Sequence, residues 1–345
     1  MKPVRMKDIA RDLGVSVITV SKALHNQSDI STATRARVLK RASELNYKPN
    51  YAARALVTGR THMIGLVVPD LVHSFHSEIA KGLAGVLRKS GYSLVISSSE
   101  ESQQVEEQAI EQLVARRVDA LLIASTQVSP VSFRRLTEAN IPFILIDRTI
   151  PDVEASFVGV DDELVGVMAT EHLLAVGCRV IGHIGGVHIS PARGRLEGYK
   201  QALLKHGITP NPDYVVMLST LDELAHGVGY ESAQKLLSRN PRPDGIFCFS
   251  DAIAIGAMGA ILDAGLRIPE DVALVGCSNL HYDPFLRVPL SSVDQQSVAI
   301  GRRAARLAIS LIESESKVAP KAILLEPKLM VRDSTKRSSG TSREK

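Results

Sequence analysis

The sequence has 345 residues, of which 45% are hydrophobic, 23% are charged and only 4% are aromatic. This length exceeds one typical domain, and the composition is that of a globular protein rather than a disordered or collagen-like chain. No apolar run approaches the roughly 20 residues of a membrane-spanning helix, and the N-terminus lacks the apolar stretch of a secretory leader, so we expect a cytoplasmic protein without membrane contact.

Charge is distributed unevenly along the chain. Residues 1–60 contain 12 Lys and Arg but only 4 Asp and Glu, which gives this segment a charge of +8. The remaining residues carry a net charge of −4. A basic head on an acidic body indicates a nucleic-acid-binding module attached to a second kind of domain.

The three cysteines, Cys178, Cys248 and Cys277, lie far apart and follow no CxxC spacing. In a reducing compartment they are most simply small buried hydrophobic residues. A metal site of Cys178 with His183 and His188 is the alternative, but its spacing is not that of known zinc ligands. We therefore predict neither a metal site nor a cofactor.

The first two predicted helices span residues 6–13 and 17–24. Gly14 supplies the turn between them, and Ser16 is a suitable N-cap for the second helix. Two helices joined in this way form a helix-turn-helix, whose second helix enters the major groove of DNA. The side chains expected to face the DNA are Val17, Ile18 and Lys22.

A third helix is predicted from Thr32 to Leu45, with Ser31 as its N-cap. It ends before Pro49 because the residue that precedes a proline disfavours helix. A short helical stretch follows at residues 51–57. It is too short to be stable alone in water, so we expect it to order only on DNA or against a second copy of the chain.

Beyond residue 61, short apolar runs alternate with helix-like stretches. Strands are predicted at 64–68, 93–97, 120–124, 143–146, 157–160, 180–184, 245–249 and 272–275, and strand-like segments at 322–325 and 329–331. Helices are predicted at 78–88, 105–115, 164–175, 254–264 and 297–313. This alternation predicts an α/β fold with parallel sheets covered on both faces, and roughly ten strands divide best into two doubly wound lobes.

Polar residues follow most of these strands. In open parallel sheets ligands bind beyond the carboxyl ends of the strands, so these residues are expected around one cleft. A carboxylate can accept sugar hydroxyls, and an arginine can bind a carboxylate or a vicinal diol. The expected cleft residues are His73, Phe75, Asp147, Arg148, Asp161, Asp251 and Ser278.

Five segments together resemble the lactose-repressor (LacI-type) family of bacterial transcription regulators. They are MKDIA at 6–10, GVS at 14–16, TVSKAL at 19–24, LNYKPN at 45–50 and ARAL at 53–56. The similarity continues through nearly the whole chain. It implies a three-helix DNA-binding head, a hinge helix and a two-lobed effector domain that resembles periplasmic binding proteins.

Domain boundaries follow from this resemblance. The head is expected at 1–49, the hinge helix and linker at 50–61, and the effector domain at 62–333. The N-lobe is expected at about 62–161 with 291–320, and the C-lobe at about 162–290 with 321–333. The tail at 334–345 has almost no apolar residue and is expected to be disordered.

The resemblance also implies individual DNA contacts. Val17, Ile18 and Lys22 would read the major groove, and Ser16, Thr19, Ser21 and Asn26 would bind phosphates. Tyr47 and Asn50 would fix the register of the head on the DNA, and Arg54 is also expected to contact DNA. Leu56 would enter the minor groove at the operator centre and kink the duplex. Many relatives carry Arg at position 22, which reads guanine O6 and N7 through two donors, whereas Lys discriminates less sharply.

The expected effector site includes Arg195, within RLEGY at 195–199, because this segment resembles the family segment whose arginine contacts the effector. Asp251 is expected to line the pocket or to support it from behind. Relatives that sense neutral sugars often carry an acidic residue at the position of Ser278, so its absence here favours a sugar acid over a sugar. The alternative is that Asn279 takes over the hydroxyl contacts of a neutral sugar.

Two other classes of protein are considered. A solute-binding protein for transport would share the two lobes, but it would need a secretory leader and would have no DNA-binding head. An enzyme is disfavoured because no nucleophile elbow, phosphate loop or zinc motif occurs. The sequence therefore predicts a transcriptional repressor that is not an enzyme and that binds a pseudo-palindromic operator in double-stranded DNA. It is expected to be a homodimer, since the tail lacks the leucine heptads that assemble tetramers.

Overall fold

The computed structural model describes residues 4–24, 26–48, 55, 59–127, 129–218, 225–314, 316 and 318–337. The chain divides into two compact units, Met1–Thr61 and His62–Lys345. Among the described residues, no helix is both long enough and apolar enough to cross a membrane.

The first unit is a three-helix head. Its helices are α1 (Met6–Leu13), α2 (Val17–Leu24) and α3 (Thr32–Glu44). Gly14 makes the turn after α1 with a left-handed φ of +63°, and the Ser16 and Ser31 hydroxyls accept backbone N–H groups at the starts of α2 and α3. The core of the head is buried and aliphatic: Ile9, Ala10, Val20, Ala23, Val38 and Ala42. The predicted helix-turn-helix is confirmed.

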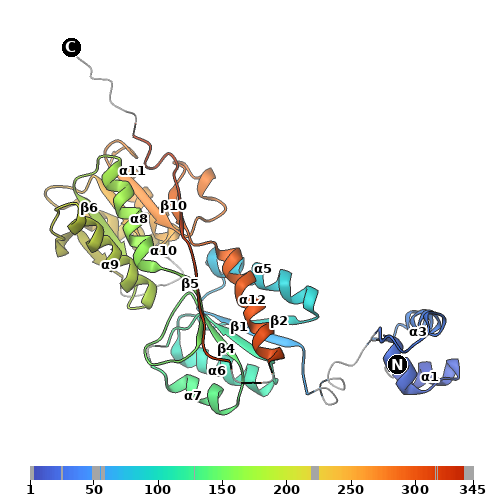
Figure 1. Ribbon diagram of the computed structural model, residues 1–345. Helices are drawn as coiled ribbons and strands as arrows, with labels where there is room; N and C mark the ends of the chain where they lie inside the picture. The colour runs from blue at the N-terminus through green and yellow to red at the C-terminus, as the bar shows by residue number, and fades with distance from the viewer. Residues whose placement is uncertain are drawn as a thin grey trace. The chain divides into compact units, whose positions relative to one another are not determined.

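The described residues of the second unit contain two six-stranded sheets, one in each lobe (Figure 1). The first sheet has the order β11 (Ala322–Leu325), β5 (Ser156–Val160), β4 (Phe143–Ile146), β3 (Ala120–Ile123), β1 (Met63–Val68) and β2 (Ser93–Ser98). The second has the order β12 (Lys328–Met330), β10 (Ser291–Asp294), β9 (Ala273–Cys277), β8 (Gly245–Cys248), β6 (Ile181–Gly185) and β7 (Val215–Met217). Every neighbouring pair is parallel except β10 with β12.

Helices cover both faces of each sheet, as the alternating sequence predicts. The first lobe has α5 (Ser74–Leu87) and α12 (Ser297–Glu313) packed together on one face, and α6 (Gln103–Ala115) and α7 (Val131–Glu138) on the other (Figure 1). The second lobe has the helix pairs α8 (Asp162–Ala175) with α9 (Ser190–Lys205) and α10 (Ala225–Leu237) with α11 (Asp251–Asp263). Short 3-10 turns occur at Arg88–Ser90, Pro212–Tyr214 and Asp283–Phe285.

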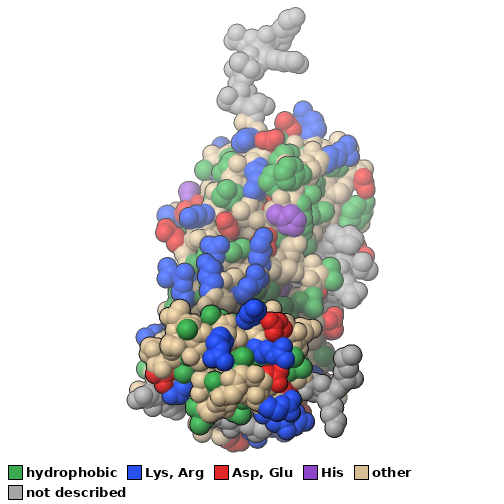
Figure 2. All heavy atoms as spheres, turned by 90° about the vertical axis from the view of Figure 1, so that its right-hand side faces the viewer, with side chains coloured by type: hydrophobic (Ala, Val, Ile, Leu, Met, Phe, Trp, Pro, Cys, Tyr) green, Lys and Arg blue, Asp and Glu red, His purple; other side chains and the backbone are tan. Residues whose placement is uncertain are grey.

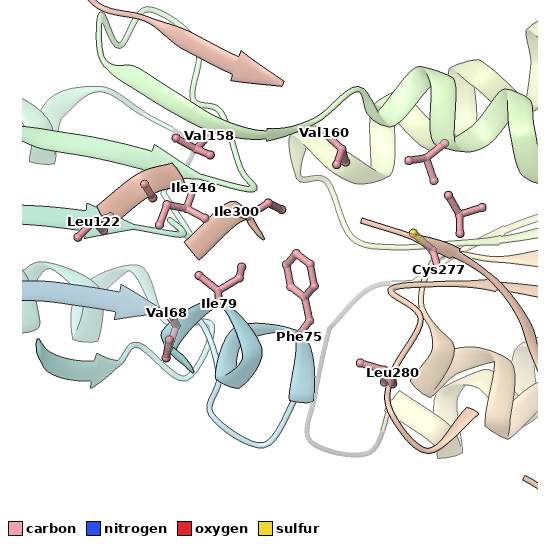
Figure 3. Packing of buried hydrophobic residues seen from close by; sticks show 14 of the residues in the cluster. Val68, Phe75, Ile79, Leu122, Ile146, Val158, Val160, Cys277, Leu280 and Ile300 are labelled. Atoms are coloured by element: carbon pink, nitrogen blue, oxygen red, sulfur yellow. The ribbon is translucent and has the colours of Figure 1, made fainter. Parts of the chain in front are cut away.

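A single cluster of buried side chains extends from the first lobe into the second. Phe75, at the start of α5, lies between side chains of the first sheet and Cys277 and Leu280 of the second lobe (Figure 3). All three cysteines are buried and free, which agrees with their expected role as small hydrophobic residues. The described residues contain no group of metal-ligating side chains.

The chain crosses between the lobes three times, after β5, after β10 and after β11. The second and third crossings therefore lie near 295 and 326, a few residues later than the sequence boundaries at 290 and 320. Strand β10 belongs to the C-lobe sheet and β11 to the N-lobe sheet, which corrects the expected lobes. The error arose because Ser291–Asp294 is mostly polar and does not look like a buried strand.

The expected disorder of the tail is wrong for its first residues. Ser334 and Thr335 are fully buried. The Ser334 hydroxyl donates to the Leu274 carbonyl at 2.6 Å, and the Thr335 and Ser291 hydroxyls are 2.7 Å apart. These residues are held by polar contacts with the second sheet rather than by apolar burial, so hydropathy could not reveal them. Residues 338–345 lie outside the described residues.

Candidate functional sites

The first candidate site is the exposed face of α2 in the head. Val17 and Ile18 are 44% and 68% exposed although both are aliphatic. The Ser16 hydroxyl accepts the Thr19 backbone N–H at 3.0 Å and lies 2.9 Å from the Thr19 hydroxyl, which holds the start of the helix. This face therefore presents apolar and hydroxyl groups, as the prediction of a DNA-reading helix requires.

Four further predicted DNA contacts differ in their surroundings. The Lys22 ammonium forms an ion pair with the Asp29 carboxylate. Asn26 is exposed in the turn after α2, with a left-handed φ of +56°. Tyr47 is half-buried against the core of the head, and this burial raises the pKa of its hydroxyl. Ser21 is also half-buried, while the predicted contacts Asn50, Arg54 and Leu56 lie outside the described residues.

The second candidate site is a cavity of about 290 Å³ between the two lobes. Of the residues predicted for an effector, six line it: His73, Phe75, Asp147, Arg148, Arg195 and Ser278. They come from the loops that follow β1, β4 and β9, from the start of α5 and from α9. The fold thus brings together residues that are far apart in the sequence.

Two predicted residues lie elsewhere. Asp161 is exposed and caps α8, where its carboxylate accepts the Leu164 backbone N–H at 3.1 Å. Asp251 is fully buried behind the cavity, where it accepts the Ser292 hydroxyl at 2.7 Å and the Leu280 N–H at 3.2 Å. Asp251 therefore holds the loop after β9, which carries Ser278, and does not line the cavity itself.

Both arginines of the cavity are already bonded to carboxylates. Arg148 donates twice to Glu101, from Nη2 to Oε1 at 2.7 Å and from Nη1 to Oε2 at 3.0 Å. Arg195 Nε donates to Asp162 Oδ1 at 3.0 Å, and its Nη1 donates to the Phe249 carbonyl at 2.5 Å. The cavity therefore holds two guanidinium groups whose orientation is fixed by these acceptors.

Asp147, Ser278 and Gln295 connect the lobes at the back of the cavity. Gln295 follows β10 at a chain crossing, and its Nε2 donates to Asp147 Oδ1 at 3.4 Å. Its Oε1 accepts the Ser278 hydroxyl at 3.3 Å. Burial raises the pKa of Asp147, while the nearby Arg195 and Arg148 lower it. Because the Gln295 side-chain amide contacts both lobes, a change in the angle between the lobes would alter its hydrogen bonds.

Aromatic and imidazole rings form the rest of the lining. Phe75, Phe249 and Tyr282 offer apolar faces, and the Arg195 guanidinium lies 4.5 Å from the centre of the Phe249 ring. Burial lowers the pKa of both His73 and His76, so these imidazoles are neutral at neutral pH. Neutral imidazoles, aromatic faces and carboxylates can bind a hydroxyl-rich molecule with apolar C–H faces.

Sequence reasoning missed several lining residues. They are His76, Glu101, Ile189, Phe249, Tyr282 and Gln295. Glu101 comes shortly after β2, so extending the strand-end argument by a few residues could have found it. Gln295 follows a strand that its polar sequence conceals, and Tyr282 reaches the cavity from a long loop. No pattern in the sequence indicates these last two positions.

Comparison with known proteins places these sites in a context. Residues 5–50 match bacterial regulatory proteins of the lacI family, and residues 170–335 match the periplasmic binding protein-like domain. The chain is 34% identical to the HTH-type transcriptional regulator GalR of Escherichia coli (strain K12), over 90% of this chain and 89% of that one. It is 30% identical to the HTH-type transcriptional repressor PurR of Pasteurella multocida, over 96% and 98%.

Solved structures agree with this similarity. The lac repressor dimer bound to operator and the anti-inducer ONPF matches with a TM-score of 0.84 and 26% identity, over 97% of this chain and 99% of that one. The complex of the transcriptional regulator CelR with cellobiose matches with a TM-score of 0.72 and 29% identity, over 96% and 99%.

Proposed function

This chain belongs to the lacI family of bacterial regulatory proteins, and we propose that it is a homodimeric repressor controlled by a sugar or sugar acid bound between its lobes. It is a DNA-binding transcription regulator, as its relatives are, and not an enzyme. The proposal adds the class of ligand, the homodimeric state and a pseudo-palindromic operator. The observation that carries it is the cavity at the strand ends of both lobes, which combines charged, hydroxyl and aromatic side chains, in a chain whose head also has an exposed helix face.

Of the two ligand classes, the cavity favours a neutral sugar. The sequence favoured an acid because Ser278 replaces a carboxylate. However, three of the described lining residues carry carboxylates, Asp70, Glu101 and Asp147, and they lie beside two arginines. Because Arg148 is bonded to Glu101 and Arg195 to Asp162, an anionic ligand would compete with a half-buried carboxylate for either guanidinium group. The volume, near the small end of the roughly 300–1,000 Å³ typical of ligand sites, fits a monosaccharide.

Ligand binding would act through the angle between the lobes. The Thr149 N–H of the first lobe donates to the Ser190 hydroxyl of the second at 2.8 Å, and Gln295 contacts both lobes. A ligand that holds the lobes together changes these contacts. In a dimer, this would separate the two hinge segments at 50–61 and withdraw Leu56 from the operator centre. The alternative is that the ligand tightens operator binding and so acts as a co-repressor.

A thermal-shift screen of the full-length protein tests the ligand class. Neutral monosaccharides are expected to raise the melting temperature, because a ligand at about 100 times its Kd adds about 2.7 kcal/mol. Arg195→Ala should abolish the shift, whereas Arg267→Gln, which changes an ion pair with Asp271 outside the cavity lining, should retain it. Shifts by sugar acids alone would contradict the neutral-sugar assignment.

A further inference from the structure

An ion pair between described residues of the head lies on the surface that is expected to read DNA. Lys22, in the last turn of α2, contacts Asp29 in the turn that leads to α3. Their side chains are 38% and 51% exposed, so the pair is open to solvent and to a bound duplex. The contact with Lys22 also lowers the pKa of the Asp29 carboxyl, so Asp29 is charged at every physiological pH.

Backbone and side-chain hydrogen bonds hold the turn that carries Asp29. Asn26 N–H donates to the Ala23 carbonyl at 3.3 Å, and Gln27 N–H donates to the Lys22 carbonyl at 3.1 Å. Arg35 of α3 donates to the Gln27 carbonyl at 2.6 Å. The carboxylate therefore stays near Lys22 because the turn positions it, and not only because the two charges attract.

The other acidic groups of the head have structural partners. Asp8 accepts the Arg5 N–H at 2.9 Å at the start of α1. Asp12 and Glu44 both bind Arg41 of α3, the latter at 3.0 Å. Asp29 differs because its ion-pair partner is the residue expected to contact guanine.

We propose that Asp29 is a specificity-determining residue that competes with DNA for the Lys22 ammonium. On a duplex of arbitrary sequence the pair remains closed, so Lys22 neutralises no phosphate and Asp29 repels the backbone. On the operator, close insertion of α2 lets Lys22 exchange the carboxylate for the guanine O6 and N7 acceptors. Asp29 thus weakens non-specific binding more than specific binding. The inference rests on the proposed role of Lys22.

The test uses the full-length protein and two labelled duplexes, one of random sequence and one selected by the wild type from a random library. Binding is measured by fluorescence anisotropy between 50 and 200 mM salt. Asp29→Asn should steepen the slope of log K against log salt by about 0.9 for each bound head. Affinity for the random duplex should rise about five- to tenfold per head near 0.1 M salt, and affinity for the selected duplex should rise less.

Two variants separate this competition from a general effect of charge. Glu44→Gln removes a carboxylate from the same head, beside Arg41 rather than Lys22, and should change the slope by much less. In a Lys22→Gln background, Asp29→Asn should lose most of its effect, because no ammonium remains to be released. Circular dichroism and melting temperature verify that each variant is folded.

The proposal is overturned if Asp29→Asn leaves the non-specific slope unchanged, lowers affinity for the random duplex or acts no differently from Glu44→Gln. In those cases the wild type still selects a consensus sequence, so the proposed function survives. If the wild type selects no sequence at all, sequence-specific repression fails together with the inference. The selection step therefore distinguishes the two failures.

Discussion

For single residues, position after a strand predicted some cavity contacts correctly and others wrongly. Arg148 and Asp147 were expected in the cleft because they follow a predicted strand, and both line the cavity. Asp161 also follows a strand, yet it serves as a helix cap. The strand-end position is the same in both cases, and only the three-dimensional direction of the side chain distinguishes a ligand contact from a cap.

Asp283 provides a pH-dependent test at this scale. It is fully buried beside Asp251. Burial and the neighbouring Asp251 charge raise the pKa of Asp283 to about 9. An unfolded aspartate has a pKa near 3.9, so between about pH 4 and 9 the folded state binds the extra proton and stability falls as pH rises.

We therefore expect Asp283→Asn to flatten the fall in unfolding free energy between pH 5 and 8, which a single proton limits to about 1.4 kcal/mol per pH unit. Denaturant titrations at several pH values measure this slope. Asp271→Asn is the control: its exposed carboxyl has its pKa lowered to about 2 by Arg267, so it is ionised in both states over this range. If Asp283→Asn leaves the slope of unfolding free energy against pH unchanged, Asp283 does not hold an extra proton in the folded state.

At the scale of elements, prediction succeeded where local signals are strong. The helices at 6–13 and 17–24 have the bounds predicted from the glycine turn and the serine cap. The missed strands are β7, which has only three residues, and β10, whose four residues are mostly polar. Strand β7 is stabilised by pairing with β6, and β10 by pairing with β9 and β12. Such contacts between distant segments leave no local pattern in the sequence.

The packing of α5 on α12 gives a second test. At Gly301 an added Cβ would lie 2.1 Å from the Ile79 carbonyl oxygen of α5, so Gly301→Ala must move the two helices apart. We expect a loss of about 1–3 kcal/mol of unfolding free energy, the usual cost of overpacking a core. Thermal and denaturant unfolding measure it.

Gly85, on the exposed side of α5, is the matched control. A Cβ there meets nothing within 4 Å, so Gly85→Ala should stabilise the protein by up to about 1 kcal/mol through helix propensity. If both alanine variants are stabilised, the close approach of α5 and α12 is not as described.

At the scale of the whole molecule, uneven charge and the β-α alternation were enough to predict a head followed by a two-lobed body. The boundaries between the lobes were less predictable, because the chain crosses three times through short polar segments. The composition of the cavity was only partly predictable. Gln295 and Tyr282 come close to Asp147 and Arg148 only after both lobes have folded.

The central claim is that a ligand in the cavity controls operator binding by the head. The most direct test is anisotropy of the full-length protein on its selected operator, with and without the sugar that raises its melting temperature. We predict that the sugar lowers operator affinity at least fivefold, since allosteric coupling is typically about 1–3 kcal/mol, and that Arg195→Ala abolishes this effect. A sugar that stabilises the wild type but leaves its operator affinity unchanged would contradict the account.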